Sequence, residues 1–320
     1  MMSENVSVLL FFVLFASVLG SDGRSSTEVN EPDEMVVYRL PGNTIPVSYN
    51  LNIMPDYNYF TNTVDFNGEV EILIDVISKT STITLNCNDI LIYVVYVHEK
   101  KTKDNIDVLE VKNDSQNEQC NILLRTQLKV GIRYVVNIEY HVNIRVNNME
   151  GFYKSTYNNK DNHKQWLLLT YFEPTGARSI FPCYDEPSYK TPFNITLTRP
   201  KNQSSRANMP IYTSYYDKSV QDMRDIFVET PPISTHMVVF VISGFDPTTT
   251  GSVASRSPVY VFSDFDRLDQ LQYVSGEAPK LLAAMESFTE VPYELPKLDL
   301  FAIPDFKSDS MGNWGLNTFR

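Results

Sequence analysis

Apolar residues in the first three quarters of the chain recur at every second position, which is the period of a strand with one buried face. The segments 70–76, 83–87 and 134–140 follow this alternation, with polar or acidic residues between the apolar ones. The segment 90–97 is apolar throughout, so we expect a strand that is covered on both faces. Short strands with turn residues between them, and no long helical period, predict a mainly β fold over 36–245, arranged as a β-sandwich or a saddle.

The pattern changes after 244–253, a stretch rich in Gly, Pro, Ser and Thr that is typical of a domain boundary. Two strands are expected beyond it, at 258–262 and 298–303. Between them we expect an amphipathic helix with Ser275 as N-cap and Pro279 in the first turn. Its apolar face consists of Ala278, Leu281, Leu282, Met285 and Phe288. The segment 246–320 therefore resembles the start of an α/β domain, in which the helix and strands have too little to pack against.

The N-terminus is typical of a secretory signal peptide over 1–20. An apolar run at 8–19 ends in small residues that suit cleavage after Gly20, although the preceding residues lack Lys and Arg and include Glu4. The alternative, a membrane anchor, needs about 20 apolar residues, and this run is shorter. We expect a secreted protein with a flexible spacer at 21–35. Attachment to a membrane would need an anchor beyond Arg320.

Composition limits the class of partner. Hydrophobic residues make up 42% of the chain and charged residues 21%, which favours a folded protein with a real core. The net charge of −12 argues against nucleic acid as a partner, because phosphate backbones bind basic surfaces.

Cysteines and glycosylation sequons fit an extracytoplasmic protein. Cys87, Cys120 and Cys183 are too few for a disulfide scaffold, and the odd number leaves at least one thiol unpaired. Cys87 and Cys120 either pair or remain buried thiols. Three sequons predict N-glycosylation, at Asn113, Asn194 and Asn202.

The most specific stretch is TYFEPTGARSIFPCYDEPSYKTPF at 170–193. It begins as a strand, and Pro174 ends the ladder, so Glu173 is presented where the backbone leaves the sheet. Rims of this kind often carry function. A structural alternative is that Glu173 pairs with Arg178 to stabilise the turn. The acidic stretch 185–187, Asp-Glu-Pro, indicates a turn or a helix start.

This stretch resembles the segment T-Q-F-E-P-T-x-A-R-x-x-F-P-C-x-D-E-P-x-x-K of the zinc aminopeptidases of the aminopeptidase N type. Further marks resemble the same family, namely 39–41, 151–153, 208–210, 230–235 and 304–316, where the last resembles P-D-F-x-x-G-A-M-E-N-W-G-L. The resemblance covers almost the whole mature chain. It implies an N-terminal β-domain followed by a thermolysin-like α/β catalytic domain, and a reaction that removes N-terminal amino acids from peptides.

The family's zinc is held by H-E-x-x-H and a further glutamate, and none of these elements is found here. His98-Glu99 lacks the second histidine four residues on, and the other three histidines, His141, His163 and His236, are scattered among strands. We therefore assign no catalytic residue, no metal ligand and no cofactor to this chain, with zinc expected only in the full-length family. The chain alone is expected to be inactive.

The resemblance also implies residues that grip the substrate. Family members bind the free α-amino group of a peptide with two glutamates, and Glu173 preserves the first. The second is replaced by Gly312, while Met311 and Asn313 remain, and Tyr171 replaces the glutamine. Asp309 is an alternative source of the missing carboxylate, on a different backbone path.

Two functions are compatible with these residues. The first is the N-terminal portion of a secreted zinc aminopeptidase, whose catalytic domain continues beyond Arg320 and whose partners are peptide N-termini. The second is a secreted, non-catalytic binding protein that keeps the β-domain for a protein partner. The altered 309–312 stretch favours the second, because a chain without zinc has no need of an ammonium clamp.

Overall fold

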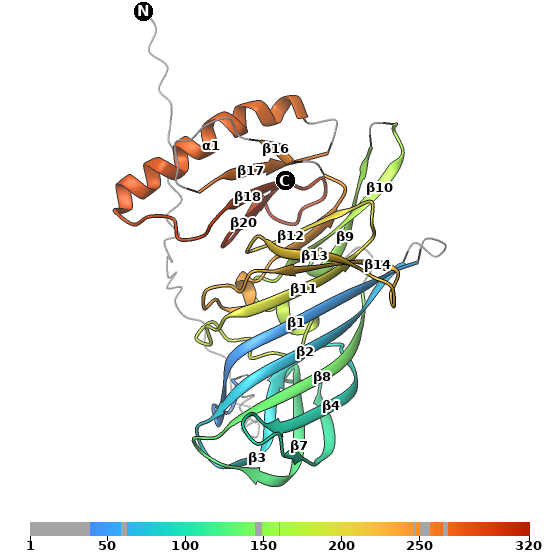
Figure 1. Cartoon of the computed structure of the whole chain (residues 1–320), viewed down its shortest axis with the longest axis vertical. Helices are drawn as coiled ribbons and strands as arrows, with labels where there is room; N and C mark the ends of the chain where they lie inside the picture. Colours follow the sequence, from blue (N-terminus) through green and yellow to red (C-terminus); the bar gives the residue numbers. More distant parts are fainter. Residues whose placement is uncertain are drawn as a thin grey trace, which may run out of the picture. The chain divides into compact units, whose positions relative to one another are not determined.

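The computed structural model describes residues 39–58, 63–144, 149–159, 161–245, 247–249, 257–264 and 268–320, and Figure 1 shows the arrangement of their strands and helix. The predicted signal peptide 1–20 and spacer 21–35 lie outside the described residues. Within that part of the chain, no helix has the length and apolar character needed to cross a membrane.

An eight-stranded sheet forms the largest layer, and its long central strands lie side by side in Figure 1. In spatial order the strands are β13 (Ile211–Asp217), β14 (Asp222–Phe227), β11 (Phe193–Arg199), β1 (Thr44–Asn58), β2 (Thr63–Val76), β8 (Arg133–Asn143), β4 (Leu91–Glu99) and β5 (Asn105–Ile106). Only β1 and β11 pair in parallel. The predicted alternation is confirmed in β2, where Val70, Ile72 and Ile74 are buried while Glu69 and Glu71 lie on the other face.

The expectation that 90–97 forms a strand covered on both faces is wrong. The segment forms most of β4, but Leu91, Tyr93 and Tyr96 are exposed by 56%, 57% and 61%. β4 lies next to the short edge strand β5, and only one of its faces meets the core. A continuous apolar run does not reveal whether a second layer covers the strand.

Two smaller sheets complete the β-domain. One contains β12 (Ser204–Ala207), β15 (Phe240–Ser243), β10 (Lys164–Tyr171) and β9 (Gly151–Asn158), in that order, and the other contains β3 (Thr80–Asn86), β7 (Gln119–Leu128) and β6 (Val108–Asp114). Short 3₁₀ helices occupy Ala177–Ser179 and Thr235–Met237. Phe152 joins the layers, because its ring lies 5.5 Å from that of Phe66 and 5.1 Å from that of Phe240.

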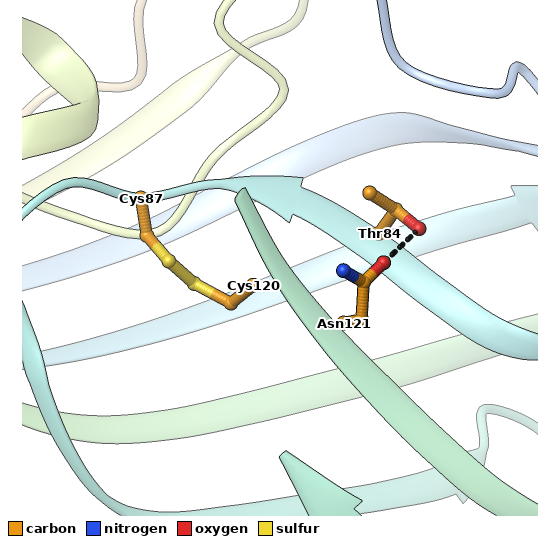
Figure 2. Close-up of a disulfide and its surroundings, with 4 residues drawn as sticks. All are labelled: Thr84, Cys87, Cys120 and Asn121. Atoms are coloured by element: carbon orange, nitrogen blue, oxygen red, sulfur yellow. Dashed lines mark hydrogen bonds between the residues drawn. A yellow bond between two sulfur atoms is a disulfide. The ribbon is translucent and has the colours of Figure 1, made fainter. Parts of the chain in front are cut away.

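A disulfide joins Cys87 to Cys120, which settles the pairing that the sequence left open (Figure 2). Beside it, the Thr84 hydroxyl donates a hydrogen bond of 2.8 Å to the Asn121 side-chain oxygen, so the same strand pair is joined twice. Cys183 is a buried free thiol. The paired cysteines are separated by 33 positions in the sequence, and a cross-link over that distance stabilises the fold by about 3–4 kcal/mol through restriction of the unfolded chain.

The last part of the chain forms a five-stranded sheet with one helix. The sheet contains β16 (Pro247–Thr249), β17 (Val259–Phe262), β18 (Leu298–Ala302), β20 (Leu316–Phe319) and β19 (Ser310–Asn313), in that order, and α1 (Leu268–Thr289) connects β17 to β18. β17, β18 and β20 are parallel neighbours. The mainly β fold with an α/β C-terminal part is therefore confirmed.

The predicted helix exists, but its start and its buried face differ from the expectation. α1 begins at Leu268, so Ser275 is a buried interior residue rather than an N-cap, and Pro279 lies inside the helix. Leu271 and Leu282 pack against β17 and β18. Leu281, Met285 and Phe288, which the spacing placed on one apolar face, are exposed by 65%, 56% and 79%. The buried side of the helix contains Leu271, Ala278 and Leu282, so two residues of the expected apolar face do pack against the sheet.

The expectation that the strands after residue 257 lack packing partners is also wrong. One buried cluster contains Phe262, Phe301 and Leu316 from the five-stranded sheet together with Leu167 and Val241 from the four-stranded sheet. The rings of Phe262 and Phe301 stack 4.3 Å apart. Residues 38–320 consequently form one compact unit.

Candidate functional site

Glu173 lies two residues after the end of β10, as the sequence predicted. Its side chain is exposed, and within the described part of the chain it makes no hydrogen bond or ion pair. The Glu173–Pro174 peptide bond is cis. The carboxylate borders a cavity of about 380 Å³, which we call the Glu173 cavity. A carboxylate without an internal partner is available to an external cation.

The Glu173 cavity is acidic. Glu150, Glu118 and Asp89 line it together with Glu173, and the aromatic residues Tyr171 and Phe152 contribute to its wall. Lys307 forms an ion pair with Glu150, and its ammonium also lies 5.8 Å from the centre of the Tyr171 ring. This hydrogen-bonded ion pair raises the pKa of Lys307. One ammonium of the chain itself therefore already rests at the edge of the cavity.

The alternative in which Glu173 pairs with Arg178 is wrong. The Arg178 guanidinium donates to the Asp185 carboxylate at 2.9 Å and to Glu118 at 3.1 Å. Burial alone would lower the pKa of Arg178, but the bonds to Asp185 and Glu118 raise it above its usual value. Arg178 thus fixes the loop that follows Glu173 and leaves the Glu173 carboxylate unpaired.

The Asp-Glu-Pro stretch at 185–187 leads into a turn that the N–H of Tyr189 closes by donating to the backbone oxygen of Glu186 at 3.0 Å, so of the two expected alternatives the turn is confirmed. Both carboxylates of the stretch have partners within the chain. Besides Arg178, Asp185 accepts a hydrogen bond from the Thr235 hydroxyl, and its backbone N–H donates to Asn86. Glu186 accepts hydrogen bonds from the Arg39 side chain and from the backbone N–H of Leu40. The carboxylates of this stretch therefore stabilise the fold through hydrogen bonds within the chain.

The second family segment forms the β19–β20 hairpin, residues 310–319. Met311 and Asn313 are 6% and 4% exposed, so the alternation of β19 turns both side chains inward and leaves Gly312 outward. Tyr171 packs against the same buried cluster as Met311, and its ring lies 5.6 Å from that of Phe306. Among the described contacts, none joins Glu173 to Met311 or Asn313.

Asp309, the alternative source of the missing carboxylate, lies on the surface beside β19 and has a partner of its own, and its role stays a prediction. Its side chain is 94% exposed, and its carboxylate holds the guanidinium of Arg320. The roles of Met311, Asn313, Tyr171 and Gly312 in substrate binding remain predictions.

Several residues around the site escaped the sequence reasoning. Glu150 precedes the Gly-Phe-Tyr mark and Lys307 follows Pro-Asp-Phe, so proximity to a motif was the only available signal. Asn208 lies within a recognised mark, and its side chain donates to the backbone oxygen of Trp314, 106 positions away. Contacts of this range cannot be obtained from local pattern.

No zinc site is formed by the part of the chain that the structure describes. Among the described residues, no three His, Cys, Asp or Glu side chains gather as a metal site would require. His98 lies on β4 with its Nε2 3.5 Å from the Lys103 ammonium, and burial, together with that charge, lowers its pKa.

The three predicted glycosylation residues lie in different settings. Asn202 is exposed in the turn between β11 and β12, and Asn113 is exposed near the end of β6. Asn194 lies within β11, and its amide donates a hydrogen bond of 2.9 Å to Glu229. Asn113 and Asn202 are both exposed, and of the three only Asn202 lies outside a strand.

Comparison with known proteins agrees with the two family segments. Residues 45–237 match the Peptidase M1 N-terminal domain, and residues 273–320 match the Peptidase family M1 domain. The chain is 36% identical over 288 residues to endoplasmic reticulum aminopeptidase 1 of Homo sapiens, covering 88% of this chain and 29% of that protein. It is 34% identical over 289 residues to endoplasmic reticulum aminopeptidase 2 of Bos taurus, with coverage of 88% and 29%.

A third relative is the membrane alanyl aminopeptidase of Manduca sexta, 32% identical over 299 residues, which cover 88% of this chain and 30% of the relative. The chain thus spans 29–30% of the length of these relatives. Because the N-terminal domain model alone matches more than half of the chain, the protein belongs to the peptidase M1 family.

Proposed function

We propose that this chain supplies the part of an M1 aminopeptidase that recognises the free N-terminus of a peptide, with Glu173 as the residue that receives the α-ammonium group. The observation that carries the proposal is the Glu173 carboxylate, which is exposed at the edge of an acidic cavity and has no partner among the described residues. The relatives named above are aminopeptidases, which act at peptide N-termini.

The chemistry of Glu173 suits this task. An ionised carboxylate only accepts hydrogen bonds, and an ammonium only donates them, so the pair selects a free amine over an acylated one. Glu150 and Glu118 add negative potential around the cavity and attract cations, although both already pair with cations of the chain.

The backbone of β19 supplies a second element. β19 is the edge strand of the five-stranded sheet, and such an edge can pair with an extended peptide through backbone hydrogen bonds. Gly312 is exposed on this strand, and a Cβ at its position would meet no atom within 4 Å. In this proposal Glu173 selects the peptide's end and β19 aligns its backbone.

Hydrolysis belongs to elements that the described residues do not provide. A bound zinc would activate the attacking water in the family reaction. Because no zinc ligand set is found among the described residues, we expect the chain alone to bind peptide N-termini without cleaving them. Zinc-dependent release of leucine from a leucine anilide by the purified chain would contradict this.

The binding proposal is tested with leucinamide and N-acetyl-leucinamide, which differ in the free amine. We expect isothermal titration or ligand-observed NMR to detect leucinamide alone, and Glu173→Gln to weaken it about tenfold or more. The matched control is Glu110→Gln on β6, whose carboxylate is 55% exposed and pairs with Lys112. Equal binding of both amides, or no effect of Glu173→Gln, would refute the role of Glu173.

We further propose that the chain enters the secretory pathway through residues 1–20 and carries glycans, with Asn202, which is exposed and lies outside a strand, as one acceptor. Expression in eukaryotic cells should yield secreted protein whose mass falls after glycosidase treatment. Asn202→Gln should remove one glycan, and an unchanged mass would exclude that site.

A second candidate function is a non-catalytic binding protein that uses the β-domain to hold a protein partner. Gly312 favours it, since one carboxylate of the family's ammonium clamp is missing. Sequencing the transcript beyond the codon for Arg320 separates the two candidates. A reading frame that continues to H-E-x-x-H supports the aminopeptidase, whereas a stop codon there, with a matching intact mass, supports the binding protein.

A further inference from the structure

The turn at Trp314 and Gly315, which joins β19 to β20, is fixed by residues from distant parts of the chain. Gly315 has a φ of +94°, a backbone conformation that residues other than glycine rarely adopt. A Cβ at this position would overlap the carbonyl oxygen of Asn208. The backbone of the turn therefore lies directly against the backbone of the β-domain, with no room for a side chain between them.

Asn208 holds the turn with its side chain. The residue is 1% exposed. Its Nδ2 donates hydrogen bonds of 2.8 Å to the carbonyl oxygens of Trp314 and Met237, and its Oδ1 accepts one of 3.0 Å from the N–H of Val239. All three partners are backbone groups. The amide consequently fixes the distance between the turn and the 237–239 stretch, independently of side-chain packing.

The 237–239 stretch leads directly to the strand that presents Glu173. The N–H of Phe240, the next residue, donates a hydrogen bond of 3.0 Å to the Thr170 hydroxyl near the end of β10. β15, which starts at Phe240, pairs with β10 through Leu169 and Val241. A continuous series of hydrogen bonds therefore runs from Thr170, three positions before Glu173, through Asn208 to Trp314.

Lys297 supports the same turn from the other side. Its side chain is 6% exposed, and its ammonium donates to the carbonyl oxygens of Ala207 and Gly315, at 2.5 and 2.8 Å. Its third bond, of 2.7 Å, goes to the Asp299 carboxylate, so the buried charge is paired. Ala207 immediately precedes Asn208, so the ammonium and the amide join the same two backbone segments.

We infer that Asn208, supported by Lys297, is a positioning residue that sets the β19 edge at a fixed place relative to the Glu173 end of β10. This rests on the proposed function, in which β19 aligns the peptide backbone while Glu173 binds its ammonium. The two elements belong to different sheets. The distance between them must therefore suit one peptide whose ammonium binds Glu173 while its backbone pairs with β19. Asn208 and Lys297 fix this distance through hydrogen bonds within the protein, without contacting the peptide themselves.

The position of the turn can be measured without a ligand. The chain has two tryptophans, so Trp166→Phe leaves Trp314, whose carbonyl oxygen accepts the Asn208 hydrogen bond, as the only one. In this background we expect Asn208→Ala to red-shift the Trp314 emission and to increase acrylamide quenching about twofold, because the turn loses its fixed contact with the β-domain. Asn208→Asp is the sharper variant. It keeps the size and the acceptor but loses both donors, so it should behave like Asn208→Ala. If Asn208→Asp matched the unaltered residue instead, the inference would be overturned.

The consequence for the site is measured with leucinamide. We expect Asn208→Ala to weaken leucinamide binding about tenfold with Glu173 intact, because Glu173 and the β19 backbone can then no longer contact the same ligand in the right geometry. Ile72→Ala is the control, since it removes a fully buried core side chain of the eight-stranded sheet, destabilises the fold and should leave the affinity unchanged. An equal loss in both variants would reduce Asn208 to a structural residue. No binding by the unaltered protein would refute the proposed function, and the fluorescence result would still decide whether Asn208 fixes the turn.

Discussion

The two segments that carry the family resemblance, residues 170–190 and residues 304–316, use their polar residues in opposite ways. In the first, Arg178 and Asp185 form a buried ion pair, and Glu173 is left exposed beside a cavity. In the second, Met311 and Asn313 are buried, and the outward position is Gly312. Most polar residues of these family segments therefore stabilise the fold, and only the few side chains without an internal partner are available to a ligand.

The largest expected effect comes from breaking the scaffold of the first segment. Asp185→Ala removes the carboxylate that pairs with Arg178. The side chains of Arg178 and Asp185 are 12% and 2% exposed. Arg178 keeps its ion pair with Glu118 in this variant, so the loss should be about 1–3 kcal/mol of unfolding free energy, measured by urea denaturation. Asp107→Ala is the control, since the Asp107–Arg125 pair is about two-thirds exposed and should matter little. Similar losses in both variants would mean that Arg178 and Asp185 are not the support of this loop.

A smaller effect is expected from giving the second segment the group it lacks. A Cβ at Gly312 meets no atom within 4 Å, so Gly312→Glu should be accommodated without strain. If β19 and Glu173 face the same ligand, the introduced carboxylate should strengthen leucinamide binding about tenfold, the gain of one charged hydrogen bond. Gly312→Gln provides an uncharged side chain of the same size. Equal affinities for the Glu and Gln variants would show that Gly312 does not face the ammonium.

Sequence reasoning succeeded where the decisive interaction is local. The alternation at 70–76 predicted the buried face of β2, because a strand's period is set by its own backbone. Pro174 placed Glu173 at the end of β10 for a similar reason, since proline cannot continue the ladder. Both conclusions depend on residues a few positions apart.

It failed where the partner is distant in sequence. Arg178 was paired with Glu173 because they are close in the chain, whereas one of its carboxylate partners, Glu118, lies 60 positions away. Ser275 has the chemistry of an N-cap, yet α1 starts at Leu268 and buries it. The hydrogen bond from Asn208 to Trp314 is a further long-range contact of this kind. Such contacts depend on how the sheets stack, and nothing in the local pattern records that.

The smallest expected effect concerns pH and the surroundings of the β19–β20 hairpin. Burial raises the pKa of Tyr293 to about 12, and its hydroxyl donates a hydrogen bond of 3.4 Å to the backbone oxygen of Lys297. The unfolded chain ionises this phenol near pH 10. The folded state retains a proton that the unfolded state loses, so the contribution of Tyr293 to stability is complete below pH 10 and is lost as the pH rises towards about 12.

Tyr293→Phe removes this titration and keeps the ring. We expect the melting temperature of the unaltered protein to fall more steeply above pH 10 than that of the variant, while the two curves run parallel near neutral pH. Other buried tyrosines, such as Tyr153 and Tyr184, also have raised pKa values, but both proteins contain them and their effect cancels in the difference. Parallel curves through the alkaline range would mean that the Tyr293 hydroxyl is already solvated in the folded protein. The surroundings of the β19–β20 hairpin would then be less tightly packed than those of the Glu173 loop.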